Sequence, residues 1–164
     1  MKAERPGFRM VRRDELLQEL VHDSYKSRKK LPEPTRCPDC GAVFQRGRWS
    51  WGGEAAAANE ERCPACHRIH DRFPAGYVAL KGSFFTAHRD EILQRVRNCE
   101  ETEKRSHPLE RLMRVEDTEE GVLVTTTGTH LARRIGDALF DAYKGDLDYH
   151  YNKEENLLRV AWHR

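Results

Sequence analysis

The sequence predicts an α+β protein in which a small cysteine-rich module precedes a long helix and a β-β-α-β-β antiparallel-sheet domain. Two observations lead to this prediction. Four of the five cysteines form two C-x-x-C pairs with 22 residues between them. Beyond residue 82, segments with apolar residues at helical spacing alternate with segments in which every second residue is apolar. We therefore divide the chain into a basic arm with a proline linker at 1–35, a module at 36–82, and a helix-and-sheet domain at 83–164.

The two cysteine pairs, Cys37/Cys40 and Cys63/Cys66, each carry a proline after the first cysteine. A C-x-x-C turn can aim both sulfurs at one ion, so two facing turns complete the tetrahedral set of four thiolates that Zn²⁺ favours. Gly41 follows the first pair and suits the left-handed backbone of such a turn. With 34% charged and 38% hydrophobic residues, the core must be small and a metal would help to hold it. The pattern predicts a zinc ribbon with one structural Zn²⁺.

Three other chemistries also use C-x-x-C pairs. Cys63 to His67 matches the C-x-x-C-H motif of haem attachment, but residues 1–30 contain no apolar export signal and the first pair would have no role. A redox dithiol needs its pair at the start of a helix in a β-α-β unit, and we expect neither pair there. Disulfides are uncommon without secretion. His67 and His70 are close enough in sequence to compete as ligands, but four available thiolates favour a supporting or surface role for both.

The first two regions contain short predicted elements. Asp14 is placed to cap a helix whose apolar face comprises Leu16, Leu17, Leu20 and Val21. A Pro-x-Pro stretch at 32–34 predicts an extended linker. Inside the module we expect strand at 42–44 and 46–51, an inserted loop or short helix at 52–58, and a strand at 77–80 that closes the small sheet.

The third region begins with a helix that Ser83 or Thr86 caps and that ends near residues 103–106. Its inner face comprises Phe84, Phe85, His88, Ile92, Leu93 and Val96. The elements expected after it are strands at 111–116 and 122–127, a helix from Thr129 to Gly145, and strands at 147–151 and 158–162. Gly136 in the middle of that helix predicts close packing on the sheet, because glycine there otherwise costs about 1 kcal/mol. One face of the antiparallel sheet should be covered by helix.

Charge is unevenly distributed along the chain. Residues 1–36 contain ten Lys/Arg and six Asp/Glu, whereas residues 101–164 contain ten Lys/Arg and thirteen Asp/Glu. A basic arm ahead of a zinc module suits contact with phosphates, and a solvated tail is the alternative. The candidate nucleic-acid or partner-binding residues are Lys26, Arg28, Lys29, Lys30, Arg46, Arg48, Trp51, Arg133 and Arg134. Trp49 fits the core of the ribbon better than a base-stacking position.

Taken together, these motifs resemble a family of small, largely uncharacterised bacterial zinc-ribbon proteins, which is similar to part of the archaeal and eukaryotic nuclear export adaptor of the large ribosomal subunit. The resemblance covers about residues 35–155 and is carried by Cys37-Pro-Asp-Cys40 with Phe44 and Gly47-Arg48-Trp49, Cys63-Pro-Ala-Cys66-His67-Arg68, Leu112-Met-Arg-Val-Glu116, Gly121-Val122, His130-Leu-Ala-Arg-Arg-Ile-Gly136 and Ala142-Tyr143-Lys144. It implies a zinc-dependent scaffold that docks on ribosomal RNA or a ribosomal protein. The adaptor's additional zinc site and further β domains have no counterpart here, so nuclear export is not implied.

The residues also rank the classes of function. No Gly-rich phosphate-binding motif is present, and four thiolates would leave the ion no open position for catalysis. We expect a non-catalytic protein that binds RNA or ribosomal particles. The alternative is a protein-protein interaction or regulatory module, and a zinc-dependent or redox enzyme is the least favoured. No small-molecule substrate is expected. No apolar run approaches the ~20 residues of a membrane span, so we expect a cytoplasmic protein.

Overall fold

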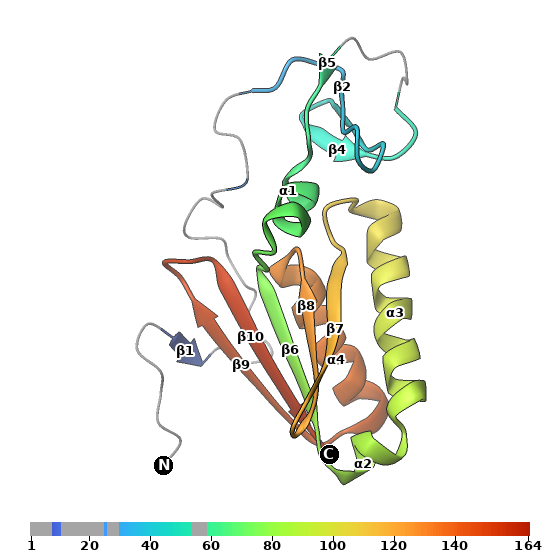
Figure 1. Ribbon diagram of the computed structural model, residues 1–164, viewed down its shortest axis with the longest axis vertical. Coiled ribbons are helices and arrows are strands. Elements are labelled where there is room, and N and C mark those ends of the chain that lie inside the picture. Colours follow the sequence, from blue (N-terminus) through green and yellow to red (C-terminus); the bar gives the residue numbers. More distant parts are fainter. Residues whose placement is uncertain (1–7, 11–24, 26–29, 54–58) are drawn as a thin grey trace.

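The computed structural model describes the backbone of residues 8–10, then Tyr25, residues 30–53 and residues 59–164. It confirms an α+β fold with two separate sheets. A four-stranded sheet lies at one end of the elongated molecule, and a six-stranded sheet with helices forms the larger part (Figure 1). The helix expected at 14–21 and most of the insertion expected at 52–58 lie outside the described residues.

The smaller sheet has the strand order β4-β3-β2-β5. Its strands are very short: β2 is Thr35–Arg36, β3 Val43–Gln45, β4 Arg48–Ser50 and β5 Asn59–Glu60. The β3–β4 hairpin turns at Arg46 and Gly47, whose φ angles of 54° and 75° are those of a tight two-residue turn. Helix α1, Pro64–Asp71, follows β5. Strands of two or three residues bury little apolar surface, so this sheet needs another source of stability.

The larger sheet has the order β1-β9-β10-β6-β8-β7. These strands are β1 Phe8–Met10, β6 Gly76–Lys81, β7 Leu112–Thr118, β8 Gly121–Thr126, β9 Asp146–Asn152 and β10 Leu157–His163. Two expectations were wrong. Strand β6 does not close the small sheet, and the larger sheet is mixed because β6 pairs in parallel with β10. The physical reason is burial: Val78 and Leu80 of β6 are fully buried in the core of the larger sheet.

Three helices accompany this sheet: α2 Ser83–Ala87, α3 Arg89–Ser106 and α4 Thr129–Tyr143. Helix α4 packs along the sheet, and α3 packs beside α4 (Figure 1). The single long helix expected from residue 83 is interrupted at His88, although its predicted end near 103–106 is confirmed. His88 is also exposed instead of facing the core, and Phe84 is half-buried.

Packing between α4 and the sheet is close at Gly136. A Cβ atom placed there would lie 2.8 Å from Cγ1 of Val160, so the predicted close approach is confirmed. The start of α4 differs from the prediction. Thr129 is the first helical residue and Gly128 is the N-cap residue. Glycine has no side chain with which to cap the helix. Instead the Glu110 carboxylate accepts the backbone N–H of Leu131 at 3.0 Å.

The core of the larger domain is formed mainly by the helix-facing residues of β6, β8, β9 and β10 and by α3 and α4. Its largest fully buried side chains include Trp162, Phe85, Leu80, Ile92, Leu131, Ile135, Leu139 and Leu158. Within the described part of the chain, no helix has both the length and the apolar composition of a membrane span.

Candidate metal centre

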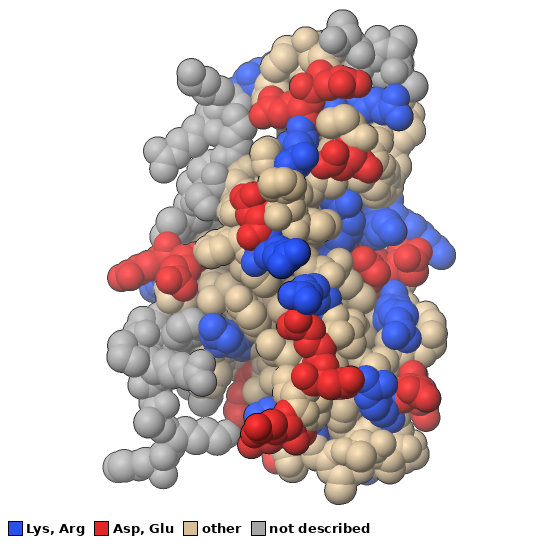
Figure 2. All heavy atoms as spheres, in the orientation of Figure 1, with Lys and Arg blue, Asp and Glu red and all other residues tan. Residues whose placement is uncertain are grey.

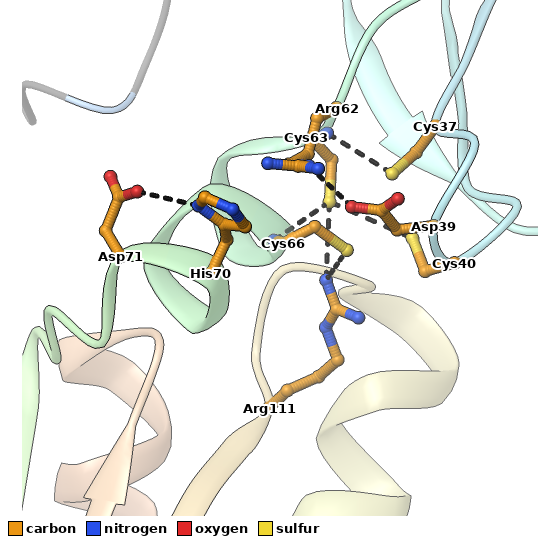
Figure 3. Close-up of polar contacts among 9 residues, drawn as sticks. All are labelled: Cys37, Asp39, Cys40, Arg62, Cys63, Cys66, His70, Asp71 and Arg111. Carbon is orange, nitrogen blue, oxygen red and sulfur yellow. Dashed lines mark hydrogen bonds and ion pairs between the residues drawn. The ribbon is translucent and has the colours of Figure 1, made fainter.

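The four paired cysteines lie together at the junction of the two sheets' domains (Figure 3). Their sulfur atoms are all within 4.8 Å of one another. The sulfurs of Cys40 and Cys63 are 3.8 Å apart. Tetrahedral coordination with zinc–sulfur bonds of about 2.3 Å requires sulfur–sulfur distances of roughly 3.8 Å. All four are free thiols and three are buried, with Cys40 half-buried. The residues therefore fit one metal ion, as the spacing predicted.

The first pair lies in the turn between β2 and β3. The Cys37 N–H donates to the Ala42 carbonyl at 2.8 Å, and the Gly41 N–H donates to the Cys37 carbonyl at 2.9 Å. Gly41 has a φ of 81°, a backbone conformation that residues other than glycine rarely adopt. This local turn places Cys37 and Cys40 on the same side, as expected from the sequence.

The second pair is at the start of a helix, where we had not expected either pair, but α1 is not part of a β-α-β unit because β5 and β6 belong to different sheets. Cys63 is the N-cap residue of α1 and Pro64 follows it in the first turn. The Cys66 N–H donates to the Cys63 sulfur at 3.4 Å, and the Cys63 N–H donates to the Cys37 sulfur at 3.3 Å. Proline fits this position because the first helical N–H has no helical partner. The helix start faces the first cysteine pair, so the arrangement serves a four-sulfur cluster.

Neither nearby histidine belongs to the cluster of metal-ligating groups found in the described residues. His70 is exposed, and its Nδ1 lies 3.1 Å from a carboxylate oxygen of Asp71, away from the sulfurs (Figure 3). His67 is half-buried. Between the two cysteine turns, Arg62 Nε forms an ion pair with Asp39 at 2.6 Å. This pair connects the segments that carry the sulfurs.

One residue of the site was missed by the sequence analysis. Arg111, just before β7, directs Nη2 to the sulfurs of Cys66 and Cys63, at 3.1 and 3.3 Å (Figure 3). Burial lowers the pKa of Arg111, but the hydrogen bond to Cys66 and the charges of the sulfurs outweigh burial and raise it. Because 45 residues separate Arg111 from Cys66, no local spacing could reveal this contact.

Burial and hydrogen bonding act in opposite directions on the thiols. Burial raises the pKa of Cys63, and it raises that of Cys66 to about 11 despite the Arg111 contact. At Cys37 burial also raises the pKa, but backbone N–H donors, including that of Cys63, outweigh it and lower the pKa to about 7. Hydrogen bonds alone therefore do not hold all four sulfurs as thiolates at neutral pH. A bound cation would do so, because metal binding displaces thiol protons.

Few apolar side chains surround the sulfur cluster. Ala65 is buried with the cysteines, and half-buried Trp49 and Leu109 pack against them. Trp49 also forms an edge contact with Phe44, with ring centroids 5.6 Å apart. The expectation that Trp49 belongs to the core of the ribbon is confirmed. So small an apolar cluster contributes little stability of its own, which fits a region that a metal ion would hold together.

The candidate binding residues occupy several places. Lys30, Arg46 and Arg48 are exposed on the smaller domain, whereas Lys26, Arg28 and Lys29 lie outside the described residues. Trp51 is half-buried, and its indole N–H donates to the Lys104 carbonyl at 2.6 Å. The remaining two lie in α4, where Arg133 pairs with Asp137 at 3.8 Å and Arg134 with Glu103 at 3.0 Å.

The surface charge is mixed. Figure 2 shows Lys and Arg side chains interspersed with Asp and Glu over the visible face, with no large area of one sign. In the first turn of α4, close in sequence to Arg133 and Arg134, the Leu131 N–H already has the Glu110 carboxylate as acceptor. Of the predicted set, the structure brings Arg46 and Arg48 together on one hairpin.

Comparisons of the chain with family models, with curated proteins and with solved structures found no match. The chemistry of the residues therefore carries the functional interpretation. A proposed function must account for three features. These are four sulfurs within 4.8 Å of one another, one guanidinium hydrogen-bonded to two of them, and an exposed hairpin that carries two arginines.

Proposed function

We propose that the protein is a non-catalytic module that one structural Zn²⁺ holds together and that binds RNA, with ribosomal particles as the expected source of that RNA. The sulfur cluster supports the first half of this proposal. Four thiolates fill a tetrahedral coordination sphere and leave no open position for water or substrate. The ion then acts by fixing the backbone around it.

The β3–β4 hairpin is the observation that carries the second half. Glu33 accepts the backbone N–H groups of both turn residues, Arg46 and Gly47, each at 3.0 Å. The side chains of Arg46, in this clamped turn, and of Arg48, directly after it, are exposed. Beyond the hairpin, the Trp51 hydrogen bond fixes the chain against the last turn of α3. The backbone that carries these two guanidinium groups is thus already ordered before binding, which lowers the entropic cost.

Guanidinium groups suit this role because they bind phosphate oxygens through two parallel hydrogen bonds. The mixed charge of the surface in Figure 2 limits how many phosphates can be contacted at once. We therefore expect modest affinity with a small dependence on salt, of about 0.7 in log–log slope for each phosphate contact to single-stranded RNA.

The test is fluorescence anisotropy of the full zinc-loaded chain with fluorescein-labelled single-stranded ribosomal RNA fragments at increasing salt. The double variant Arg46→Gln with Arg48→Gln should bind more weakly and lower the salt slope by about 1.4, the contribution of two phosphate contacts. The matched control is Arg97→Gln with Arg114→Gln, which removes the same charge from exposed positions on α3 and β7. Equal binding by the two double variants would refute the hairpin as the contact surface.

A protein partner is the second candidate, favoured by a different observation. Ile69 and Phe73 are 41% and 52% exposed, which is high for large apolar side chains. Phe73 stacks with Tyr25, with ring centroids 6.0 Å apart. Co-sedimentation with ribosomal particles distinguishes the two candidates. Binding that persists at high salt and is lost in an Ile69→Ser, Phe73→Ser variant would assign the contact to a protein, because phosphate contacts weaken with salt.

A further inference from the structure

We infer that Arg111 couples the metal centre to the six-stranded sheet, so that metal occupancy stabilises both domains of the chain. This inference rests on the proposed zinc site but not on RNA binding. It assigns a thermodynamic role to a residue that belongs to neither cysteine pair. Three observations support it: the contacts of the Arg111 guanidinium, the hydrogen bonds of the Arg111 backbone, and the charge of the metal site.

At the metal end, the guanidinium depends on the sulfurs. Its Nη2 bonds to Cys66 and Cys63 at 3.1 and 3.3 Å. Its Nε is buried and has no hydrogen-bond partner among the described residues. A buried guanidinium nitrogen without an acceptor is costly. The contacts to the two sulfurs therefore account for why the side chain is held in this position.

At the sheet end, the backbone of Arg111 is fixed to residues just beyond β8. The Arg111 N–H donates to Oγ1 of Thr127, and the Thr127 N–H donates to the Arg111 carbonyl, both at 2.9 Å. Thr127 Oγ1 donates in turn to the Leu109 carbonyl at 2.6 Å. The next residue, Leu112, donates its N–H to the Glu100 carboxylate on α3 at 2.8 Å. Through this one side chain, a shift of the sulfurs would be transmitted to β7, β8 and α3.

Charge makes this connection depend on the ion. Zn²⁺ with four thiolates carries a formal charge of −2, and the Arg111 guanidinium reduces the total to −1. Without the ion, no metal bond fixes the sulfurs at these positions, and the half-buried guanidinium would lose its two fixed acceptors. Arg111 should therefore stabilise the metal-bound protein and contribute nothing, or a penalty, to the metal-free protein. By linkage, its removal must weaken zinc binding.

The first test uses Arg111→Met in the full chain, which keeps an unbranched, flexible side chain and removes the charge and the N–H donors. Zinc affinity is measured by competition with a chromophoric chelator, and thermal unfolding is followed with and without zinc. The expected result is zinc affinity lower by roughly 5–150-fold, the usual range of coupling between sites. The melting temperature should fall for the zinc-bound form only. Arg97→Met is the matched control, since Arg97 is exposed on α3 and lies outside the sulfur cluster. Unchanged zinc affinity, or equal destabilisation with and without zinc, would overturn the inference.

The second test needs no variant and so does not depend on the folding of Arg111→Met. Amide hydrogen exchange of the wild-type chain is compared before and after zinc removal. Coupling predicts faster exchange in β7 and β8 as well as in the small sheet. Faster exchange confined to residues 30–73 would show that the sheet does not respond to the metal. A chain that binds no stoichiometric zinc would refute the zinc proposal itself, and failure to bind RNA would leave both tests interpretable.

Discussion

Substitution of one cysteine by serine should separate a structural metal site from a chance cluster of thiols. In Cys40→Ser, one of four ligands is lost. Structural zinc in small domains contributes about 10–16 kcal/mol, so one ligand corresponds to roughly 2.5–4 kcal/mol if the four contribute equally. That loss converts to a zinc affinity lower by roughly 10²–10³-fold, since each 1.4 kcal/mol is about a factor of ten.

The structure also sets the extent of the damage. The cluster buries few apolar groups besides its own sulfurs, and the sheet above it has strands of only two or three residues. Residues 30–73 should therefore lose their order when zinc is lost. Strand β6 should persist, although the sequence assigned it to the zinc module, because it lies between β10 and β8 in the larger core.

The assay combines zinc content by mass spectrometry with hydrogen exchange of the same sample. Cys99→Ser is the matched control, because Cys99 is also half-buried but lies on α3 outside the sulfur cluster. We expect one zinc per chain in the wild type and in Cys99→Ser. Wild-type zinc affinity in Cys40→Ser, or full exchange protection of residues 30–73 with a chelator present, would refute the metal as the structural element.

Three further predictions concern the larger domain and its contact with the smaller one. Gly136→Ala should destabilise by up to about 2 kcal/mol in a denaturant titration, because a new Cβ would lie 2.8 Å from Val160 Cγ1. Overpacking costs about 1–3 kcal/mol, and the helix-propensity gain offsets about 1 kcal/mol of that cost. Burial raises the pKa of the Glu110 carboxyl above its value in the unfolded chain, so the folded state binds more protons. Stability should therefore fall as pH rises from the unfolded pKa to the folded pKa. Glu110→Gln should remove this pH dependence when the free energy of unfolding is measured across pH. Trp51→Phe removes the donor to the Lys104 carbonyl and should lower stability by about 0.5–1.5 kcal/mol, with faster exchange in β4.

Local features of the structure could be predicted from the sequence because local spacing determines them. The cysteine ligands followed from two C-x-x-C pairs, and Gly41 followed from the turn that the first pair needs. Strands β7 to β10 and helix α4 followed from apolar periodicity, and the tight packing at Gly136 followed from a glycine where a helix does not favour one.

The predictions that failed concern contacts between residues far apart in the sequence. The alternation in 77–80 identifies a strand but does not say which strand it pairs with, and its parallel partner β10 is about 80 residues further along the chain. The sequence predicted Arg111 as the first residue of a strand, because no metal-binding motif lies near it in the sequence. The interruption at His88 is subtle for a different reason. Both helices keep apolar residues on one face, so periodicity alone shows no break.

The position of the sulfur cluster links the two parts of the proposed function, RNA binding and zinc binding. The hairpin that carries Arg46 and Arg48 lies in a sheet too small to be stable alone, and that sheet is held at the sulfur cluster. A chelator should therefore abolish RNA binding without touching either arginine. Arg111 contacts two sulfurs of the same cluster where the sheet domain begins. One ion bound at this junction would therefore determine both the shape of the proposed binding hairpin and its attachment to the larger domain.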